Sequence, residues 1–288
     1  MKKWKYLLKV VMAVGVIAMT AVQICTAAEG TAQAAVSEVT PVSISTNEIS
    51  GWPAGPEITS ETGVLMDADS GTLLYSKGGD EIRYPASITK IMTLLLAVEN
   101  CSLKEDVVFT ETGTRDISWD SGNIGMQVGE VMSMRACLYA LVIRSANEVA
   151  AQIAEHVGGT EQHFVDMMNE RAAQIGCTNT HFVNANGLHS EDHYTTVYDL
   201  YLMFNAAMQH EEFLQMLQEK EYQASYQAAD GTTVEAVWST TNQFTKGDVT
   251  VPDGVTAVGG KTGTTTAAMS CLVQLFEDAQ GEQYVAII

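Results

Sequence analysis

Strand-like segments lie near both ends of the chain, with helix-like segments between them, and this order constrains the fold more than any other feature. Residues 63–67 and 72–76 are apolar runs on either side of Asp69-Ser70-Gly71, which predicts a β-hairpin. Apolar residues then recur at three- and four-residue spacings, which predicts helices within residues 85–98, 134–156, 160–175 and 195–208. After about Tyr222 the strand pattern returns, in residues 232–238, 257–264, 271–276 and 284–288. We therefore predict an α/β fold of the α+β type, with one antiparallel sheet built from both chain ends and an inserted helical lobe.

The charge balance excludes one broad class of function. The 288 residues include 15 Lys plus Arg and 35 Asp plus Glu, a formal net charge of −20. Nucleic-acid binding needs a basic surface facing the phosphates, so we expect no nucleic-acid partner. The cysteines form no C-x-x-C pair and the histidines no metal-finger spacing, which argues against a structural zinc site. Four cysteines after residue 28 are widely and irregularly spaced, and we predict that they are buried free thiols: Cys101, Cys137, Cys177 and Cys271.

The first 28 residues have the order of a secretory signal peptide. Four lysines are followed by an apolar run over residues 10–22 and then by small residues, so we predict residues 1–28 as a signal peptide and an exported protein. The alternative is an uncleaved membrane anchor, although the run is short for a span. Cys25 lacks the small preceding residues expected at a lipid-modified cysteine. Cleavage after Ala28 would leave a net charge of −24 and no encoded membrane attachment, and residues 29–61 are predicted to be a linker or surface tail.

The first candidate motif is Ser87-Ile88-Thr89-Lys90, at the predicted helix start after Pro85. Residues three apart lie on one helix face, so the Ser87 hydroxyl and the Lys90 amine can meet. A serine needs a base to become a nucleophile, and a lysine can be that base when burial or a second cation lowers its pKa. An ordinary first-turn serine beside a solvated lysine is the alternative reading of the motif taken alone.

The second motif, Ser145-Ala146-Asn147, interrupts an apolar helical pattern. This interruption predicts a turn that carries polar side chains into a cleft, and a helix cap or a buried polar pair is the alternative.

The third motif is Lys261-Thr262-Gly263, which superficially resembles a phosphate-binding loop. That loop requires glycine where this chain has Val255, and it precedes a helix, whereas residues 271–273 read as strand. The nucleotide-binding interpretation therefore fails. A strand at a cleft edge would instead offer the Lys261 amine and the Thr262 hydroxyl to an anionic group, and Gly263 would let backbone approach the ligand closely.

In combination, the order S-x-x-K, S-x-N and K-T-G resembles the serine D-alanyl-D-alanine carboxypeptidases, the low-molecular-weight penicillin-binding proteins. The resemblance runs from about Glu61 to the last residue and includes further matching segments at residues 62–67, 83–86, 186–189 and 194–199. It implies a β-lactamase/transpeptidase-like fold and a catalytic domain over residues 62–288. It also implies peptidoglycan stem peptides ending in D-Ala-D-Ala as substrates, β-lactams as covalent inhibitors, and no metal or organic cofactor.

The resemblance also implies roles for the first two motifs. Ser87 would attack the carbonyl between the two terminal D-alanines, and Lys90 would accept its proton. Ser145 would pass that proton to the leaving D-alanine, and Asn147 would hydrogen-bond the substrate backbone. Water would then release the acyl-enzyme.

The third motif would bind the substrate's terminal carboxylate through Lys261 and Thr262, and Lys261 would help to keep Lys90 neutral. The backbone N–H groups of Ser87 and Thr264 would form the oxyanion hole. His189 and His193, four residues apart, could be imagined as a metal pair, but their loop-like setting favours ordinary surface histidines.

Two departures from the family pattern stand out. Thr264 follows K-T-G where the family usually has a bulky residue, which leaves the preferred substrate open. The chain stops in a predicted strand at residues 284–288, without the helix that packs on the sheet in the family, so we expect a truncated domain with an apolar sheet face exposed. The alternatives are a serine β-lactamase, although no E-x-x-L-N segment occurs, and a non-catalytic truncated penicillin-binding fragment.

Overall fold

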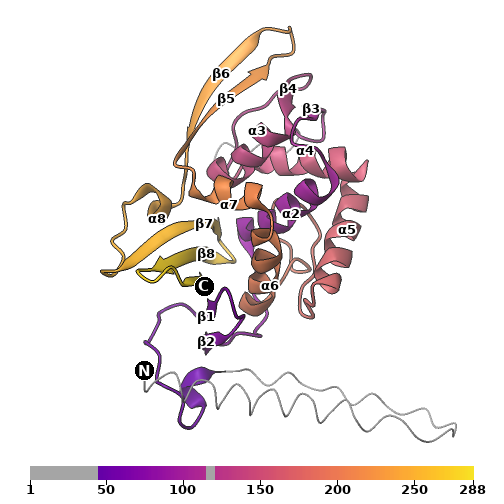
Figure 1. Cartoon of the computed structure of the whole chain (residues 1–288). Helices are drawn as coiled ribbons and strands as arrows, with labels where there is room; N and C mark the ends of the chain where they lie inside the picture. The colour runs from indigo at the N-terminus through magenta and orange to yellow at the C-terminus, as the bar shows by residue number, and fades with distance from the viewer. Residues whose placement is uncertain (1–44, 115–120) are drawn as a thin grey trace, which may run out of the picture.

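A computed structural model of the chain describes residues 45–114 and 121–288 (Figure 1). The predicted signal peptide, Cys25 and the first part of the predicted tail lie outside these residues. Within them, the helices are all too short or too polar to cross a membrane.

The main sheet has five antiparallel strands in the order β2-β1-β9-β8-β7. Its two earliest strands pair with strands from the end of the chain: Val64 of β1 lies opposite Ile287 of β9, which lies opposite Val273 of β8. The prediction of one sheet assembled from both ends is therefore confirmed. The strands are β1 (Gly63–Asp67), β2 (Leu73–Lys77), β7 (Val255–Thr265), β8 (Met269–Asp278) and β9 (Gln283–Ile287).

A second, four-stranded sheet has the order β3-β4-β5-β6 and was not predicted. The strand expected at residues 232–238 is β6, and it pairs with β5 in this sheet instead of joining the main one. The β5–β6 hairpin projects away from the helices in Figure 1, and most of its residues stay exposed or half-buried. A half-solvated hairpin has the same alternating pattern of apolar and polar residues whichever sheet it joins. The sequence therefore did not show which sheet contains these strands. The strands are β3 (Asp106–Val108), β4 (Val131–Ser133), β5 (Glu221–Gln227) and β6 (Thr233–Ser239).

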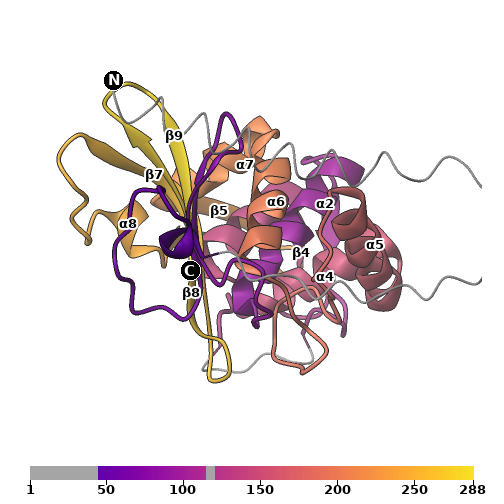
Figure 2. The ribbon, with the colours of Figure 1, turned by 90° about the horizontal axis from the view of Figure 1, so that it is seen from below.

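The helical lobe packs on one face of the main sheet, as Figure 2 shows. Inward-facing strand residues Val273, Leu275, Val285 and Ile287 are fully buried there and form one core with the helices. The helical segments are η2 (Ala86–Thr89), α2 (Lys90–Asn100), α3 (Met134–Tyr139), η3 (Ala140–Arg144), α4 (Asn147–Gly158), α5 (Glu161–Gln174), α6 (Val197–Met208) and α7 (Glu211–Gln218). The four cysteines after residue 28 are free thiols as predicted, although only two are buried and Cys101 and Cys271 are half-buried.

The other face of the main sheet carries α8 (Gln243–Lys246) and the segment that contains η1 (Thr46–Glu48) (Figure 2). The buried Thr46 hydroxyl bonds the backbone of Ser76 in β2, and Asn242 donates to the buried Gln274 of β8. Residues 45–61 therefore pack against the sheet. The last residue, Ile288, is 39% exposed.

Candidate active site

Ser87 and Lys90 lie together at the junction of two helical segments. Ser87 belongs to the 3₁₀ turn η2, and Lys90 is the first residue of α2. The Lys90 Nζ lies 3.0 Å from the Ser87 Oγ. The same Nζ lies 2.7 Å from Asn147 Oδ1 and 2.5 Å from the backbone oxygen of Asn186. Lys90 is only 1% exposed, so these contacts replace water around its amine.

The backbone around Ser87 is held by close contacts with two glycines. Ala86 has a φ of 49°, an unfavourable conformation for a residue with a side chain. A Cβ on Gly187, whose own φ is 82°, would lie 1.9 Å from the Ala86 oxygen. A Cβ on Gly263 of β7 would lie 2.9 Å from the Ser87 nitrogen. Gly263 thus allows β7 to approach the segment that carries Ser87. The sequence analysis expected this glycine to allow a close approach of the backbone to a ligand.

The second motif forms a turn between two helical segments, as the broken apolar pattern predicts. The π-helical segment η3 ends at Arg144, and its C-cap residue Ser145 has a left-handed φ of 56°. Asn147 then begins α4, and its N–H donates to the oxygen of Gly122. This turn directs the Asn147 side chain to Lys90 and the Ser145 hydroxyl to Lys261, whose Nζ lies 2.9 Å from the Ser145 Oγ.

The third motif lies on β7, which is at one edge of the main sheet. Lys261 is 2% exposed, and its Nζ also donates to the Thr262 oxygen at 2.6 Å. Neighbouring residues of a strand face opposite sides, so Thr262 and Thr264 lie on the other side from Lys261. There they line a cavity of about 390 Å³ together with residues of α8.

A larger cavity of about 610 Å³ lies beside the site. It is lined by residues 59–62, by Arg83, Tyr84 and Pro85 before η2, and by the β7–β8 turn. Ser87 lines neither cavity, although both cavities adjoin the segments that hold it.

The two buried amines have lowered pKa values. The pKa of Lys90 lies well below its usual value, first because burial removes water from the amine and second because Lys261 is a nearby cation. Glu148 acts in the opposite direction on Lys90. Burial lowers the pKa of Lys261 to about 7. Burial and the nearby Lys261 cation therefore both favour the neutral form of the lysine beside Ser87, which is the form that can act as a base.

Glu148 is a site residue that the sequence analysis did not identify. Its side chain is buried, and its Oε1 accepts N–H bonds from Ile124 (2.5 Å) and Gly125 (3.0 Å). Burial raises the pKa of this carboxyl group. Its other oxygen is buried without a hydrogen-bond partner among the described residues. The available signal was a carboxylate directly after S-x-N and before the apolar run of residues 149–151.

His193 corrects the expectation of two surface histidines. His189 is exposed, but His193 is 2% exposed and its Nε2 lies 2.8 Å from the Thr89 Oγ1. Its Nδ1 accepts the Val183 N–H, and burial lowers its pKa to about 4. Both ring nitrogens thus bond protein groups, and His193 links the loop before α6 to η2. Local sequence cannot show this role because Thr89 is more than a hundred residues away.

The fold and the Ser87–Lys90 and Ser145–Lys261 contacts are those expected of the class of proteins that carry the S-x-x-K, S-x-N and K-T-G motifs. The architecture matches the crystal structure of the Streptomyces K15 DD-transpeptidase with a TM-score of 0.75 and 26% identity, over 82% of this chain and 91% of that one. An evolved putative penicillin-binding protein homologue from Mycobacterium tuberculosis matches with a TM-score of 0.72 and 27% identity, over 83% of this chain and 86% of that one.

The chain belongs to the D-alanyl-D-alanine carboxypeptidase family, whose profile matches residues 49–286. The D-alanyl-D-alanine carboxypeptidase DacF of Bacillus subtilis is 34% identical over 153 residues, 52% of this chain and 39% of the relative. The D-alanyl-D-alanine carboxypeptidase of Streptomyces sp. K15 is 30% identical over 229 residues, 76% of each chain. The matches to the relatives from Bacillus subtilis and Haemophilus influenzae span about two fifths of those proteins.

Proposed function

We propose that the protein is a serine D-Ala-D-Ala carboxypeptidase that removes the terminal D-alanine from peptidoglycan stem peptides. The observation that carries this proposal is the 3.0 Å contact between the Ser87 hydroxyl and the buried Lys90 amine. The substrate class follows from the family and its named relatives. The reaction would take place outside the cytoplasmic membrane, where peptidoglycan lies.

Lys90 would act as the base in acylation. A neutral amine has two N–H donors and one lone pair. Asn147 Oδ1 and the Asn186 oxygen can accept the two N–H bonds, which leaves the lone pair directed at the Ser87 hydroxyl. Ser87 Oγ would then attack the carbonyl carbon between the two D-alanines as its proton passes to Lys90.

Ser145 and Lys261 would complete proton transfer and substrate binding. When the tetrahedral intermediate collapses, the C–N bond to the leaving D-alanine breaks, and Ser145 would relay the proton from Lys90 to that nitrogen. The Lys261 ammonium, bonded to Ser145, would attract the substrate's terminal carboxylate. The Thr262 hydroxyl lies on the other side of β7, beside α8, and would reach that carboxylate only where the substrate lies along the edge of the strand. Asn147 would also hydrogen-bond the substrate backbone.

The backbone would stabilise the negative oxygen of the intermediate. The close approach of Gly263 to the Ser87 nitrogen brings the β7 backbone next to the start of η2. We assign the oxyanion hole to the N–H groups of Ser87 and Thr264, a type of contact that contributes about 10²–10³-fold in rate. Water would then hydrolyse the acyl-enzyme, and apart from that water these steps use only groups of the protein.

The direct test is release of D-alanine from a synthetic acyl-D-alanyl-D-alanine peptide by the purified chain. We expect release by the wild type and by Ser225→Ala, which changes an exposed serine on β5, and none by Ser87→Ala. Equal release by the Ser87→Ala variant would contradict the proposal. Rapid turnover of a chromogenic cephalosporin without D-alanine release would instead indicate a β-lactamase.

A further inference from the structure

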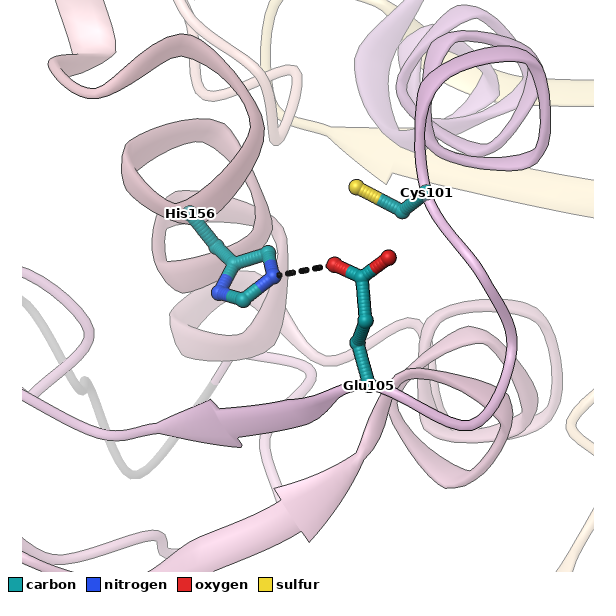
Figure 3. A group of neighbouring side chains, drawn as sticks. All are labelled: Cys101, Glu105 and His156. Carbon is teal, nitrogen blue, oxygen red and sulfur yellow. Dashed lines mark hydrogen bonds and ion pairs between the residues drawn. The ribbon is translucent and has the colours of Figure 1, made fainter.

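Three side chains of metal-binding type converge away from the active site. The Cys101 sulfur, a Glu105 carboxylate oxygen and a His156 ring nitrogen all lie within 4.8 Å of one another (Figure 3). They come from the residue after α2, the residue before β3 and the last turn of α4. The His156 Nε2 lies 3.2 Å from Glu105 Oε2, and the thiol points into the same space.

The surroundings of this cluster favour a cation. Cys101 caps the C-terminus of α2, and His156 lies in the last turn of α4, so two helix C-termini direct their negative ends towards the cluster. Glu105 adds a carboxylate, and its other oxygen accepts the Ser102 N–H at 2.7 Å. Such a second bond orients a ligating carboxylate before the metal arrives.

We propose that Cys101, Glu105 and His156 form a zinc-binding site. A thiolate, an imidazole and a carboxylate are a donor set that suits Zn²⁺, and three protein ligands leave a fourth position for water. Donors about 2.0–2.3 Å from zinc lie roughly 3.3–3.8 Å apart in a tetrahedron. Movement of these side chains by about an ångström would therefore close the site. On binding, the Cys101 thiol would release its proton to solvent, and the sulfur would bond the metal.

The site would connect the far ends of the two helices that carry catalytic groups. Lys90 begins α2 and Asn147 begins α4, and the two side chains are hydrogen-bonded to each other. Both helices then run to the cluster, about 15 Å along each helix axis. Zinc would thus fasten α2 to α4 at the end opposite the active site and stabilise their alignment.

The test is titration of the metal-free purified chain with Zn²⁺, followed by calorimetry, and with Co²⁺, followed by absorbance. We expect one equivalent to bind, a thiolate-to-cobalt charge-transfer band, and a higher melting temperature with Zn²⁺. Cys101→Ser and His156→Gln should each weaken binding at least about tenfold, since loss of even a supporting contact costs 10–100-fold. His181→Gln, which changes an exposed histidine elsewhere, should bind like the wild type.

Melting temperatures without metal show whether each variant is folded, so a loss of binding in a folded variant is interpretable. The proposal is overturned if the wild type binds no Zn²⁺ stoichiometrically. It is also overturned if the Cys101→Ser and His156→Gln variants bind as tightly as the wild type, or if Co²⁺ gives no thiolate band.

Discussion

The two ends of the α2–α4 helix pair hold polar side chains in opposite ways. At the N-terminal end, Lys90 and Asn147 are buried and bonded to each other and to neighbouring groups. At the C-terminal end, the side chains of Glu105 and His156 are 45% and 24% exposed, and Cys101 is half-buried.

The difference shows that the protein itself fixes the positions of the side chains at the N-terminal end. At the C-terminal end, a bound ligand would have to fix them. A buried polar group left without its partner costs about 1–3 kcal/mol, so each contact at the N-terminal end is strongly constrained before any substrate arrives. At the C-terminal end water competes for the same groups, and exposed ion pairs contribute only about 0–1 kcal/mol. The first end is therefore preorganised, and the second gains order from an added cation.

The largest effect is expected at the N-terminal end, from Lys90→Gln. In the proposed mechanism, removing the amine deprives Ser87 of its base, and general-base catalysis contributes about 10²–10⁴-fold in rate. We expect the rate of penicillin acylation, followed in stopped-flow or quench experiments, to fall by at least about 10²-fold. The matched control Lys104→Gln, on an exposed lysine, should react like the wild type. A fall of less than about tenfold in the Lys90→Gln variant would contradict the assignment of this base.

Lys261→Ala should have the next largest effect, and one that depends on pH. In the proposed mechanism the free enzyme needs a neutral Lys90 and a charged Lys261, and the pKa of Lys261 is about 7. In the wild type, kcat/KM for the peptide should therefore decline as pH rises through about 7. A hydrogen bond to a charged group contributes about 1.5–3 kcal/mol, so the variant should lose about 10–100-fold.

The same variant tests the coupling of the two amines. Removing the Lys261 cation raises the pKa of Lys90. The rate of acylation should rise with pH as Lys90 loses its proton, and this rise should move to higher pH in the variant. The declining limb near pH 7 should disappear with the group that causes it. A rising limb that stays in place would show that the two lysines are not coupled.

Glu148→Gln should produce a smaller shift in the opposite direction. The Glu148 charge raises the pKa of Lys90, but less than burial and Lys261 lower it. The amide oxygen can still accept the Ile124 N–H, so the loop that contains Ile124 should keep its position. Removing the negative charge lowers the pKa of Lys90, so the rising limb of the pH–acylation profile should move to lower pH. Glu170→Gln, on an exposed residue of α5, is the control. A shift of the rising limb to higher pH would contradict the electrostatic role of Glu148.

The smallest effect is expected at the C-terminal end, from Cys101→Ser in metal-free protein. Without a bound cation the partly exposed thiol contributes little, and substitutions at such positions usually change stability by no more than about 0.5 kcal/mol. Denaturant unfolding of the metal-free variant measures this directly. If the free energy of unfolding fell by more than about 1 kcal/mol, the comparison would be wrong, because the C-terminal end would then also be held by its own contacts.

Sequence could predict the parts of the fold and site that depend on local spacing. The Ser87–Lys90 contact follows from residues three apart on one helical turn, and the main sheet follows from strand patterns at both chain ends. The Asn147 turn likewise follows from a break in an apolar pattern.

The remaining features depend on long-range packing, which local patterns do not encode. The β5–β6 hairpin carries no signal that distinguishes one sheet from another. His193 is buried because Thr89 and Val183 meet it from distant segments. The 101–105–156 cluster exists only because α2 and α4 lie side by side, so its spacing matches no metal motif.

The most direct test of the central claim is to map the residue that penicillin modifies. The purified chain is incubated with a penicillin, its intact mass is measured, and the modified peptide is sequenced. If Ser87 is the nucleophile, one adduct forms per chain, lies on Ser87, persists because the tethered leaving group hinders water, and is absent from Ser87→Ala. An adduct on another residue, or one that persists in the Ser87→Ala variant, would contradict the assignment.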